Sequence, residues 1–461
     1  MTLVEYYCLK IKKMGVLGLK DMTFHLKDDF ARQPVPLAER RKWFLITLVW
    51  IGVGTDIFAA VIGLHLADGQ TVLGALIALL IANVILGIIG GYCAYIGSAT
   101  GLSTGMITRF AFGTTGGRLV TWVIVLVWFT INGASVSLLG ESAQYTLQAI
   151  GIPISVSWAA VLGGLLVTIT ATVGYIAIER LSMVAVPLML FLLGGLIGKV
   201  IGTENKGEWL HAVPTDGISL SMGSAISFIV ASWMIVVVIT PDIARWAKSK
   251  RDAYLSGFFG FLIGNSLMIG LSVIIIRITG VETVIDIFLS VGWGILAIFT
   301  IILAQWTTMD NALYSIGLGL SSLIRAPKYL LTMITGLIGC VLGYFQIHQW
   351  VAFLINISGI LLAPIAAVYM VEYFFLNRSR FLFAFIRDSQ LKPIYWTALT
   401  SWIIAALIGL MTTPPGEGGF GLFQLTTAAS LDAFLAAGII HFLIGTINER
   451  FNGPQREVTN V

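Results

Sequence analysis

Apolar runs long enough to cross a lipid bilayer recur along the whole chain, and short polar connections separate them. A membrane-spanning helix needs roughly 20 mostly apolar residues, and twelve stretches meet this requirement. The predicted helices cover residues 43–66, 71–98, 119–149, 153–176, 182–202, 222–240, 254–279, 286–309, 328–346, 349–372, 394–412 and 420–446. The pattern therefore predicts an all-α integral membrane protein with twelve transmembrane helices.

Composition and charge placement agree with a lipid-facing surface. Apolar residues make up 57% of the chain and charged residues only 11%, whereas soluble domains carry about 25% charged residues. Of the 27 Lys and Arg residues, only Lys199, Lys206 and Arg277 fall on the side opposite the two termini. Basic residues collect on the cytoplasmic side of membrane proteins, so both termini are predicted to be cytoplasmic. The basic segments are interpreted as orientation signals, and nucleic acid is not expected as a partner.

Polar residues inside the first predicted helix mark a candidate site, because polar groups in lipid need a cavity, a partner or an ion. Gly52, Gly54, Thr55 and Asp56 lie about a third to halfway through this span. Glycine weakens a helix, so the segment is predicted to unwind and to present its carbonyl groups to an ion. Asp56 then lies in or beside a solute site. The alternative is a protonated Asp56 that hydrogen-bonds to a neighbouring helix.

Two further spans carry aromatic side chains beside polar ones. Trp128 and Asn132 are four residues apart and share a helix face, and such a pair suits a flat heterocycle that stacks and hydrogen-bonds. Trp233, which follows Ser232, lies mid-span rather than at an interface. The alternative for Trp128 and Asn132 is tryptophan packing together with an interhelical hydrogen bond from Asn132.

The predicted helix 286–309 ends in two adjacent hydroxyl residues, Thr307 and Thr308. Hydroxyl oxygens can bind an alkali cation, but threonines also often bond back to their own helix. Two oxygens are too few for a complete site. Another helix's backbone would have to supply the others.

The same stretch carries a family resemblance. Residues 306–320, WTTMDNALYSIGLGL, resemble the WTTNDNALY…GLG motif of bacterial cytosine permeases, members of the nucleobase–cation symporter family of cytosine/purine permeases. Arg109-Phe110-Ala111-Phe112-Gly113 is similar to the family's RxxFG loop, and Gly264-Asn265-Ser266-Leu267-Met268 to its GNSLM segment. The matches keep one order from about residue 34 to 390.

The resemblance implies a leucine-transporter-type fold in a bacterial inner (plasma) membrane. A cytoplasmic segment, 1–42, precedes a first repeat of five helices, 43–202, and an inverted second repeat, 222–372. Two extra helices, 394–446, and a cytoplasmic tail, 447–461, complete the chain. The solute then lies between broken helices 1 and 6 and helices 3, 8 and 10.

The resemblance also implies a set of site residues. The solute is expected to contact Asp56, Trp128, Asn132, Ser232, Trp233 and Met309. A sodium ion is expected between Gly52, Thr55, Ala304, Thr307 and Thr308. Cytosine permeases carry Gln near position 128 and Asn at position 309, so the solute stays open among cytosine, purines, related pyrimidines, hydantoins and allantoin.

These features predict secondary active import of a flat heterocycle by symport with sodium or a proton, through alternating access. No prosthetic cofactor is expected, and the protein is predicted to be a monomer or weak oligomer. A channel would need rings of pore-lining groups. An intramembrane enzyme would need a paired nucleophile and base or clustered metal ligands. The sequence shows neither, and His441 within the last helix is interpreted as structural.

Overall fold

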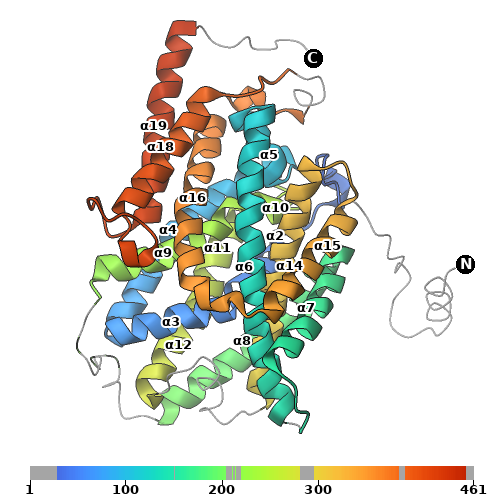
Figure 1. Ribbon diagram of the computed structural model, residues 1–461, viewed down its shortest axis with the longest axis vertical. Helices are drawn as coiled ribbons and strands as arrows, with labels where there is room; N and C mark the ends of the chain where they lie inside the picture. The colour runs from blue at the N-terminus through green and yellow to red at the C-terminus, as the bar shows by residue number, and fades with distance from the viewer. Residues whose placement is uncertain are drawn as a thin grey trace, which may run out of the picture.

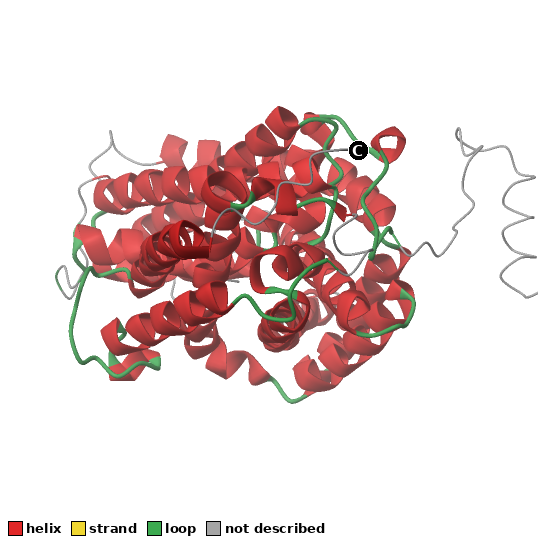
Figure 2. Ribbon diagram, turned by 90° about the horizontal axis from the view of Figure 1, so that it is seen from above, coloured by secondary structure: helices red, strands yellow, loops and turns green. Residues whose placement is uncertain are grey.

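The computed structural model describes residues 29–149, 151–203, 210, 213, 217, 220–280, 295–383 and 390–452, and these residues are almost entirely helical (Figures 1 and 2). The longer helices are α2 (Trp43–Gly54), α3 (Ile57–Gly69), α4 (Val72–Thr100), α5 (Thr104–Phe112), α6 (Thr114–Ala149), α7 (Val156–Val173), α8 (Tyr175–Thr203), α9 (Met222–Val238), α11 (Lys250–Gly260), α12 (Ser266–Thr279), α14 (Ile295–Leu323), α15 (Lys328–Tyr344), α16 (Val351–Val371), α18 (Trp396–Thr412) and α19 (Ala429–Asn452). Short pieces are η1 (Leu37–Glu39), α10 (Thr240–Ala244), η3 (Phe261–Asn265), η4 (Ile347–Trp350), η5 (Glu372–Leu376), η6 (Arg378–Arg380) and η7 (Pro415–Glu417).

Many of these helices can cross a membrane. Within the described part of the chain, seven are long and apolar enough, and α2 with α3 forms an eighth, bent by 54°. Three shorter apolar helices, α9, α15 and α18, accompany them. The prediction of an all-α membrane protein is confirmed.

The first predicted helix is interrupted where its glycines and Asp56 suggested. Thr55 (φ −98°, ψ 70°) and Asp56 (φ −125°, ψ 176°) leave the helical conformation between α2 and α3. The Asp56 carboxylate caps α3 by accepting a hydrogen bond from the Ala59 N–H at 2.8 Å, as side-chain oxygens do at helix starts. The Thr55 hydroxyl bonds back to the Ile51 carbonyl at 2.9 Å. Local hydrogen bonds therefore hold the break open.

The break in the sixth predicted helix lies away from its aromatic residue. α9 continues without interruption through Ser232 and Trp233 to Val238, and the chain changes direction at Ile239 (φ −93°, ψ 5°) before α10. Pro241 follows directly as the second residue of α10. Trp233 is thus held by regular helix rather than by unwound backbone.

Three predicted helix boundaries differ from the structure by seven residues or more, and two of these errors share a cause. α8 begins at Tyr175, not 182, and buried Glu179 pairs with Arg41 at 2.9 Å. α14 continues to Leu323, not 309, since buried Asp310 accepts a hydrogen bond from the Thr170 hydroxyl at 2.5 Å. In both, polar residues that looked like helix ends find partners inside the bundle. The predicted start of this helix, 286–294, lies outside the described residues.

The third error concerns the last helix. α19 starts at Ala429, not 420, and extends to Asn452. The preceding segment folds back on α18 instead, with the Phe420 and Leu422 N–H groups bonded to the Leu410 and Met411 carbonyls at 2.8 Å. Backbone pairing with a neighbouring helix end outweighs the apolar character that favoured a helix there.

One end of the bundle is closed by the segment before α2. Arg32 of this segment donates hydrogen bonds to carbonyls at the end of α14, and the Arg41 N–H donates to the Trp246 carbonyl at 2.6 Å. α5 and α10 lie at this same end, whereas α3 and α12 lie toward the other (Figure 1). α18 and α19 pack against each other and against α16 on one side.

Candidate functional site

A small cavity lies beside the break between α2 and α3. It measures about 40 Å³ and is bordered by α3, α6, α9, α14 and α16. Its lining residues are Asp56, Phe58, Ile62, Trp128, Ile131, Ser135, Ser232, Trp233, Ile235, Val236, Thr308, Ala312 and Ile355. Five of the predicted site residues, Asp56, Trp128, Ser232, Trp233 and Thr308, therefore meet at one place.

The α6 wall is formed by Trp128, Ile131 and Ser135, which follow at helical spacings of three and four. Asn132 lies one position off this stripe and is not among the described lining residues. It is fully buried against α15, where a Cβ atom at Gly339 would lie 2.6 Å from its amide nitrogen. Within the described part of the chain, neither amide atom of Asn132 has a hydrogen-bond partner. Ser135, and not Asn132, is therefore the polar residue of α6 that lines the cavity.

Two indole rings border the cavity from different helices. Trp128 of α6 and Trp233 of α9 are 5% and 4% exposed, and neither indole N–H has a hydrogen-bond partner among the described residues. The Ser232 hydroxyl already donates to the Phe228 carbonyl at 2.7 Å, so it can only accept from a solute. The cavity therefore offers aromatic surface together with two unpaired donors.

Asp56 brings a carboxylate to the same cavity. The Ala59 N–H occupies one of its oxygens, and an ionised carboxylate has further acceptor capacity. The backbone N–H of Ile57, the residue after Asp56, donates to the Gln305 side-chain oxygen at 3.3 Å. Asp56 is thus fixed by the start of α3 while still bordering the cavity.

Hydroxyl and carbonyl oxygens converge at the end of α2. The Thr307 hydroxyl lies 3.1 Å from the Gly52 carbonyl oxygen and 2.8 Å from that of Ala304. The Thr308 hydroxyl lies 3.1 Å from the Val53 carbonyl oxygen and 3.3 Å from that of Ala304. These neutral oxygens come from two helices and are of the kind that holds sodium where a transporter helix is broken.

The remaining predicted residues take different positions. The Thr55 hydroxyl is 3.3 Å from the Gly52 carbonyl oxygen, at the edge of this oxygen cluster. The cluster includes the Val53 carbonyl, which the sequence did not indicate. Met309 is 1% exposed and packs in the hydrophobic core, one residue beyond the cavity-lining Thr308. The structure does not bring Met309 to the cavity.

Gln305 is a site residue that sequence reasoning missed. Its side-chain oxygen accepts from the Ile57 N–H, and its amide nitrogen donates to the Ser135 carbonyl at 3.4 Å. It therefore connects α14 to the helix break and to the cavity wall of α6. A polar amide mid-helix beside the threonine pair was the available signal.

Other polar groups of the helices, including His441, have structural partners. The Asp242 carboxylate accepts from the Thr104 N–H at 2.7 Å, whereas Arg245 donates to the Asp242 backbone carbonyl. The His441 Nε2 atom lies 3.1 Å from Glu372, which also pairs with Arg380 at 3.3 Å. These contacts join helices away from the cavity.

Comparison with known proteins identifies the family. The family of permeases for cytosine/purines, uracil, thiamine and allantoin matches residues 34–431. The chain belongs to this family. It is 28% identical over 386 residues to the cytosine permease of Escherichia coli strain K12, covering 83% of this chain and 88% of that protein. The protein is therefore a multi-pass membrane transporter and not an enzyme.

Solved structures show the same fold. Mhp1, a nucleobase-cation-symport-1 family transporter in a closed conformation with bromovinylhydantoin bound, has a TM-score of 0.76 at 16% identity, over 92% of this chain and 96% of that one. The inward-facing conformation of Mhp1 has a TM-score of 0.71 at 16% identity, over 91% and 93% of the two chains. A Na⁺-coupled sialic acid symporter has a TM-score of 0.62 at 13% identity, over 94% of each chain. The permease thus has the leucine-transporter-type fold that the motifs implied.

Proposed function

We propose that this permease imports a flat heterocyclic solute by symport with sodium, and that the cavity between Trp128 and Trp233 holds the solute. The solute is a nucleobase such as cytosine or a purine, or a related pyrimidine, hydantoin or allantoin. The observation that carries the proposal is the position of Thr308. Its side chain borders the cavity, and its hydroxyl also lies 3.1 Å from the Val53 carbonyl at the helix break.

The chemistry of the cavity supports a planar solute with carbonyl oxygens. Two indole rings border the cavity and favour a π-system beside them. Their N–H groups, which are unpaired among the described residues, can donate to carbonyl oxygens. The Asp56 carboxylate can accept from a ring N–H or an exocyclic amine. Nucleobases and hydantoins carry both kinds of group on one plane. Asn132 and Met309 stay predictions as solute contacts, since each would have to turn toward the cavity.

The oxygen cluster supports sodium as the coupling ion. A sodium ion would be held by the Gly52, Val53 and Ala304 carbonyls and the Thr307 and Thr308 hydroxyls. The ion and the solute would then share α2 and its break, so each stabilises the helix arrangement that the other needs. Both of the symporters compared above are described as cation- or Na⁺-coupled. A proton carried by Asp56 is the second candidate, because that carboxyl borders the same cavity.

The size of the cavity supports alternating access. Small-molecule sites typically measure about 300–1,000 Å³, whereas this cavity of about 40 Å³ has room for only one or two waters. A heterocycle can therefore enter only after the surrounding helices separate. Residues 29–42 hydrogen-bond to other parts of the chain at one end of the bundle, which supports closure of the transport path at that end.

Topology and environment belong to the same proposal. We propose twelve spans in a bacterial inner membrane, with both termini on its cytoplasmic side. Residues 43–202 and 222–372 form inverted repeats, and 394–446 form two additional helices. Segment 1–42 begins on the cytoplasmic side, and the protein works as a monomer or weak oligomer. Support comes from the basic residues, which collect at the end closed by residues 29–42.

Uptake into proteoliposomes tests the proposal. Purified protein is reconstituted, and radiolabelled cytosine, hypoxanthine, uracil, allantoin and a hydantoin are supplied with an inward sodium gradient, an inward proton gradient or neither. Saturable accumulation of one of these solutes with the sodium gradient is expected. Absence of gradient-driven uptake of every such solute by folded protein would contradict the proposal. Accumulation with the proton gradient alone would assign the coupling to a proton.

A further inference from the structure

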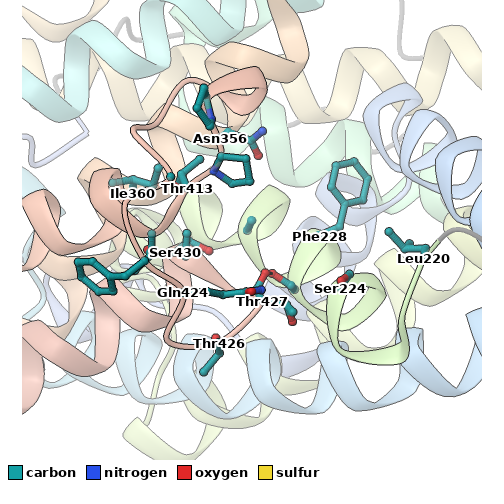
Figure 3. A pocket seen from close by; sticks show the side chains of 18 of the residues that line it. Leu220, Ser224, Phe228, Asn356, Ile360, Thr413, Gln424, Thr426, Thr427 and Ser430 are labelled. Carbon is teal, nitrogen blue, oxygen red and sulfur yellow. The ribbon is translucent and has the colours of Figure 1, made fainter.

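A second, larger cavity lies between the start of α9, the first half of α16 and the connection from α18 to α19 (Figure 3). It measures about 580 Å³, which is within the range of small-molecule sites. His65 near the end of α3 and Leu220 just before α9 also border it. Its described lining residues include none of those that line the smaller cavity.

The lining of the second cavity is uncharged and combines polar with apolar side chains. Hydroxyl and amide side chains from α9, α16 and the α18–α19 connection form much of its wall (Figure 3), and no Asp, Glu, Lys or Arg is among the described residues that line it. An acyl chain would leave these polar groups unsatisfied, and an ion would lack a countercharge. The lining therefore fits a neutral molecule that forms hydrogen bonds.

One of these polar groups lacks a partner among the described residues. Ser430 is 1% exposed, and its hydroxyl has no hydrogen-bond partner in the described part of the chain. A buried polar group left unpaired is destabilising, so a ligand that bonds to it gains stability. Phe228 adds an aromatic surface, with its ring centroid 4.6 Å from that of His65. A planar molecule with donors and acceptors matches this combination.

Specific hydrogen bonds fix the α18–α19 connection, which forms one wall of the cavity. The Asp432 carboxylate accepts from both the N–H and the hydroxyl of Thr426, at 3.1 and 2.7 Å. The Ser227 hydroxyl donates to the Thr427 carbonyl, which ties the connection to α9. The α18–α19 connection is therefore held in place as one side of a defined site.

The two cavities lie on neighbouring faces of the same two helices. On α9, Ala231 borders the large cavity and Ser232 the small one; on α16, Asn356 borders the large one and Ile355 the small one. A Cβ atom at Gly359 of α16 would lie 3.0 Å from the Ala231 carbonyl oxygen, so the helices are in close contact there. A solute in the large cavity is separated from the small one by this contact.

We propose that the large cavity is a second binding site for neutral planar heterocycles of the class that the permease transports. The site holds a solute molecule at the end of the bundle opposite residues 29–42, while the central cavity is closed. This inference rests on the proposed function for the choice of solute class. The volume, the unpaired Ser430 hydroxyl and the uncharged lining support it independently.

Protection of an introduced cysteine tests this site. Gln424 lines the cavity and is exposed, so Gln424→Cys is expected to fold and to react with a membrane-impermeant thiol reagent added outside intact cells. The wild-type chain is the blank, since Cys93 and Cys340 are buried and Cys8 lies in the segment 1–42 that is proposed to be cytoplasmic. Phe420→Cys is the matched control, because Phe420 is 61% exposed in the same connection and does not line the cavity. Cytosine, uracil and allantoin are the probes.

We expect at least one probe to slow labelling of Gln424→Cys several-fold and to leave labelling of Phe420→Cys unchanged. Protection should persist when Trp233→Ala is added, because Trp233 lines the central cavity and not the large one. It should weaken several-fold with Ser430→Ala.

Two results would overturn the second site. One is equal labelling with and without a probe that the same protein transports, which leaves transport itself intact. The other is protection that disappears with Trp233→Ala, because closure around a central solute would then explain it. Protection by these probes in a protein that transports none of the tested heterocycles would support the site and contradict the proposed function.

Discussion

At the scale of single residues, the central cavity combines polar groups that are costly to bury. The indole N–H groups of Trp128 and Trp233 have no partner among the described residues, and Asp56 is a buried carboxyl group at the break of a membrane helix. Each unpaired buried donor costs about 1–3 kcal/mol. A solute with carbonyl oxygens would recover this free energy, so these residues are where substitutions should affect binding most directly.

Trp233→Ala should abolish saturable uptake of the transported solute, whereas Trp233→Phe should retain part of it. The alanine variant loses both the ring surface and the N–H, and the phenylalanine variant loses only the N–H. Trp158→Ala, at a tryptophan of α7 that is 56% exposed, is the matched control and should leave uptake unchanged. Normal uptake by well-expressed Trp233→Ala would remove Trp233 from the site.

Asp56→Asn should lower solute affinity by about tenfold or more with little change in thermal stability. An amide oxygen can still accept from the Ala59 N–H and cap α3, but bonds to a charged acceptor are roughly twice as strong as neutral ones. Binding is measured by isothermal calorimetry, and stability by thermal unfolding in detergent. An unchanged dissociation constant would mean that Asp56 does not contact the solute.

Thr308→Val should raise the sodium concentration needed for half-maximal uptake by about tenfold, which corresponds to about 1.4 kcal/mol. Valine keeps the shape of the side chain and removes one oxygen from the cluster. Thr335→Val is the control, since the buried Thr335 hydroxyl bonds only to the Leu331 carbonyl of its own helix, at 2.7 Å. Equal sodium dependence in both variants would point to a proton as the coupling ion.

At the scale of helices, the break between α2 and α3 depends on close packing against the π-helical turn η3. A Cβ atom at Gly54 would lie 2.7 Å from the Asn265 backbone nitrogen and 2.8 Å from the Gly264 carbonyl carbon. These are backbone atoms of a packed helix and cannot move independently. The close contact therefore requires glycine at position 54.

Gly54→Ala should destabilise the protein by about 1–3 kcal/mol, the usual cost of overpacking. Gly194→Ala in α8 is the control, because a Cβ atom there would meet nothing within 4 Å. In a helix that change should be neutral or slightly stabilising. Thermal unfolding of the two purified variants gives the comparison, and equal melting temperatures would show that α2 and η3 can separate without cost.

At the scale of the whole molecule, the segment before α2 joins several helices at the closed end. Buried Arg245 donates to the carbonyls of Asp29 and Phe30, at 2.7 and 3.0 Å, and to the Tyr314 hydroxyl at 2.9 Å. Lys328 of α15 lies 3.6 Å from the Asp29 carboxylate. The proposed alternating access would have to break or move this set of bonds if this end opens.

Arg245→Lys should destabilise the closed form, since an ammonium cannot reproduce the planar fork of donors. Bonds from charged groups contribute about 1.5–3 kcal/mol each. The melting temperature should fall, and amides of residues 29–42 should exchange hydrogen faster. Arg251→Lys, at an exposed arginine of α11, is the control and should change neither. Unaltered exchange in Arg245→Lys would mean that other contacts hold this segment.

Local information was sufficient for the membrane character, the break at Gly52–Asp56, and the assignment of Trp128, Trp233 and Thr308 as candidates. Each depends on short-range properties: the length of an apolar run, the helix propensity of glycine, or a motif within one span. Such properties are present in the chain before any helix meets another.

Tertiary packing decided the rest, because it depends on residues distant in the sequence. Whether Asn132 or Ser135 borders the cavity follows from how α6 is rotated against α15 and α14. The length of α14 follows from Thr170, which pairs with Asp310 across 140 positions of the chain. The large cavity exists only because the α18–α19 connection folds onto α9. A single sequence contains these residues, but it does not specify which of them meet.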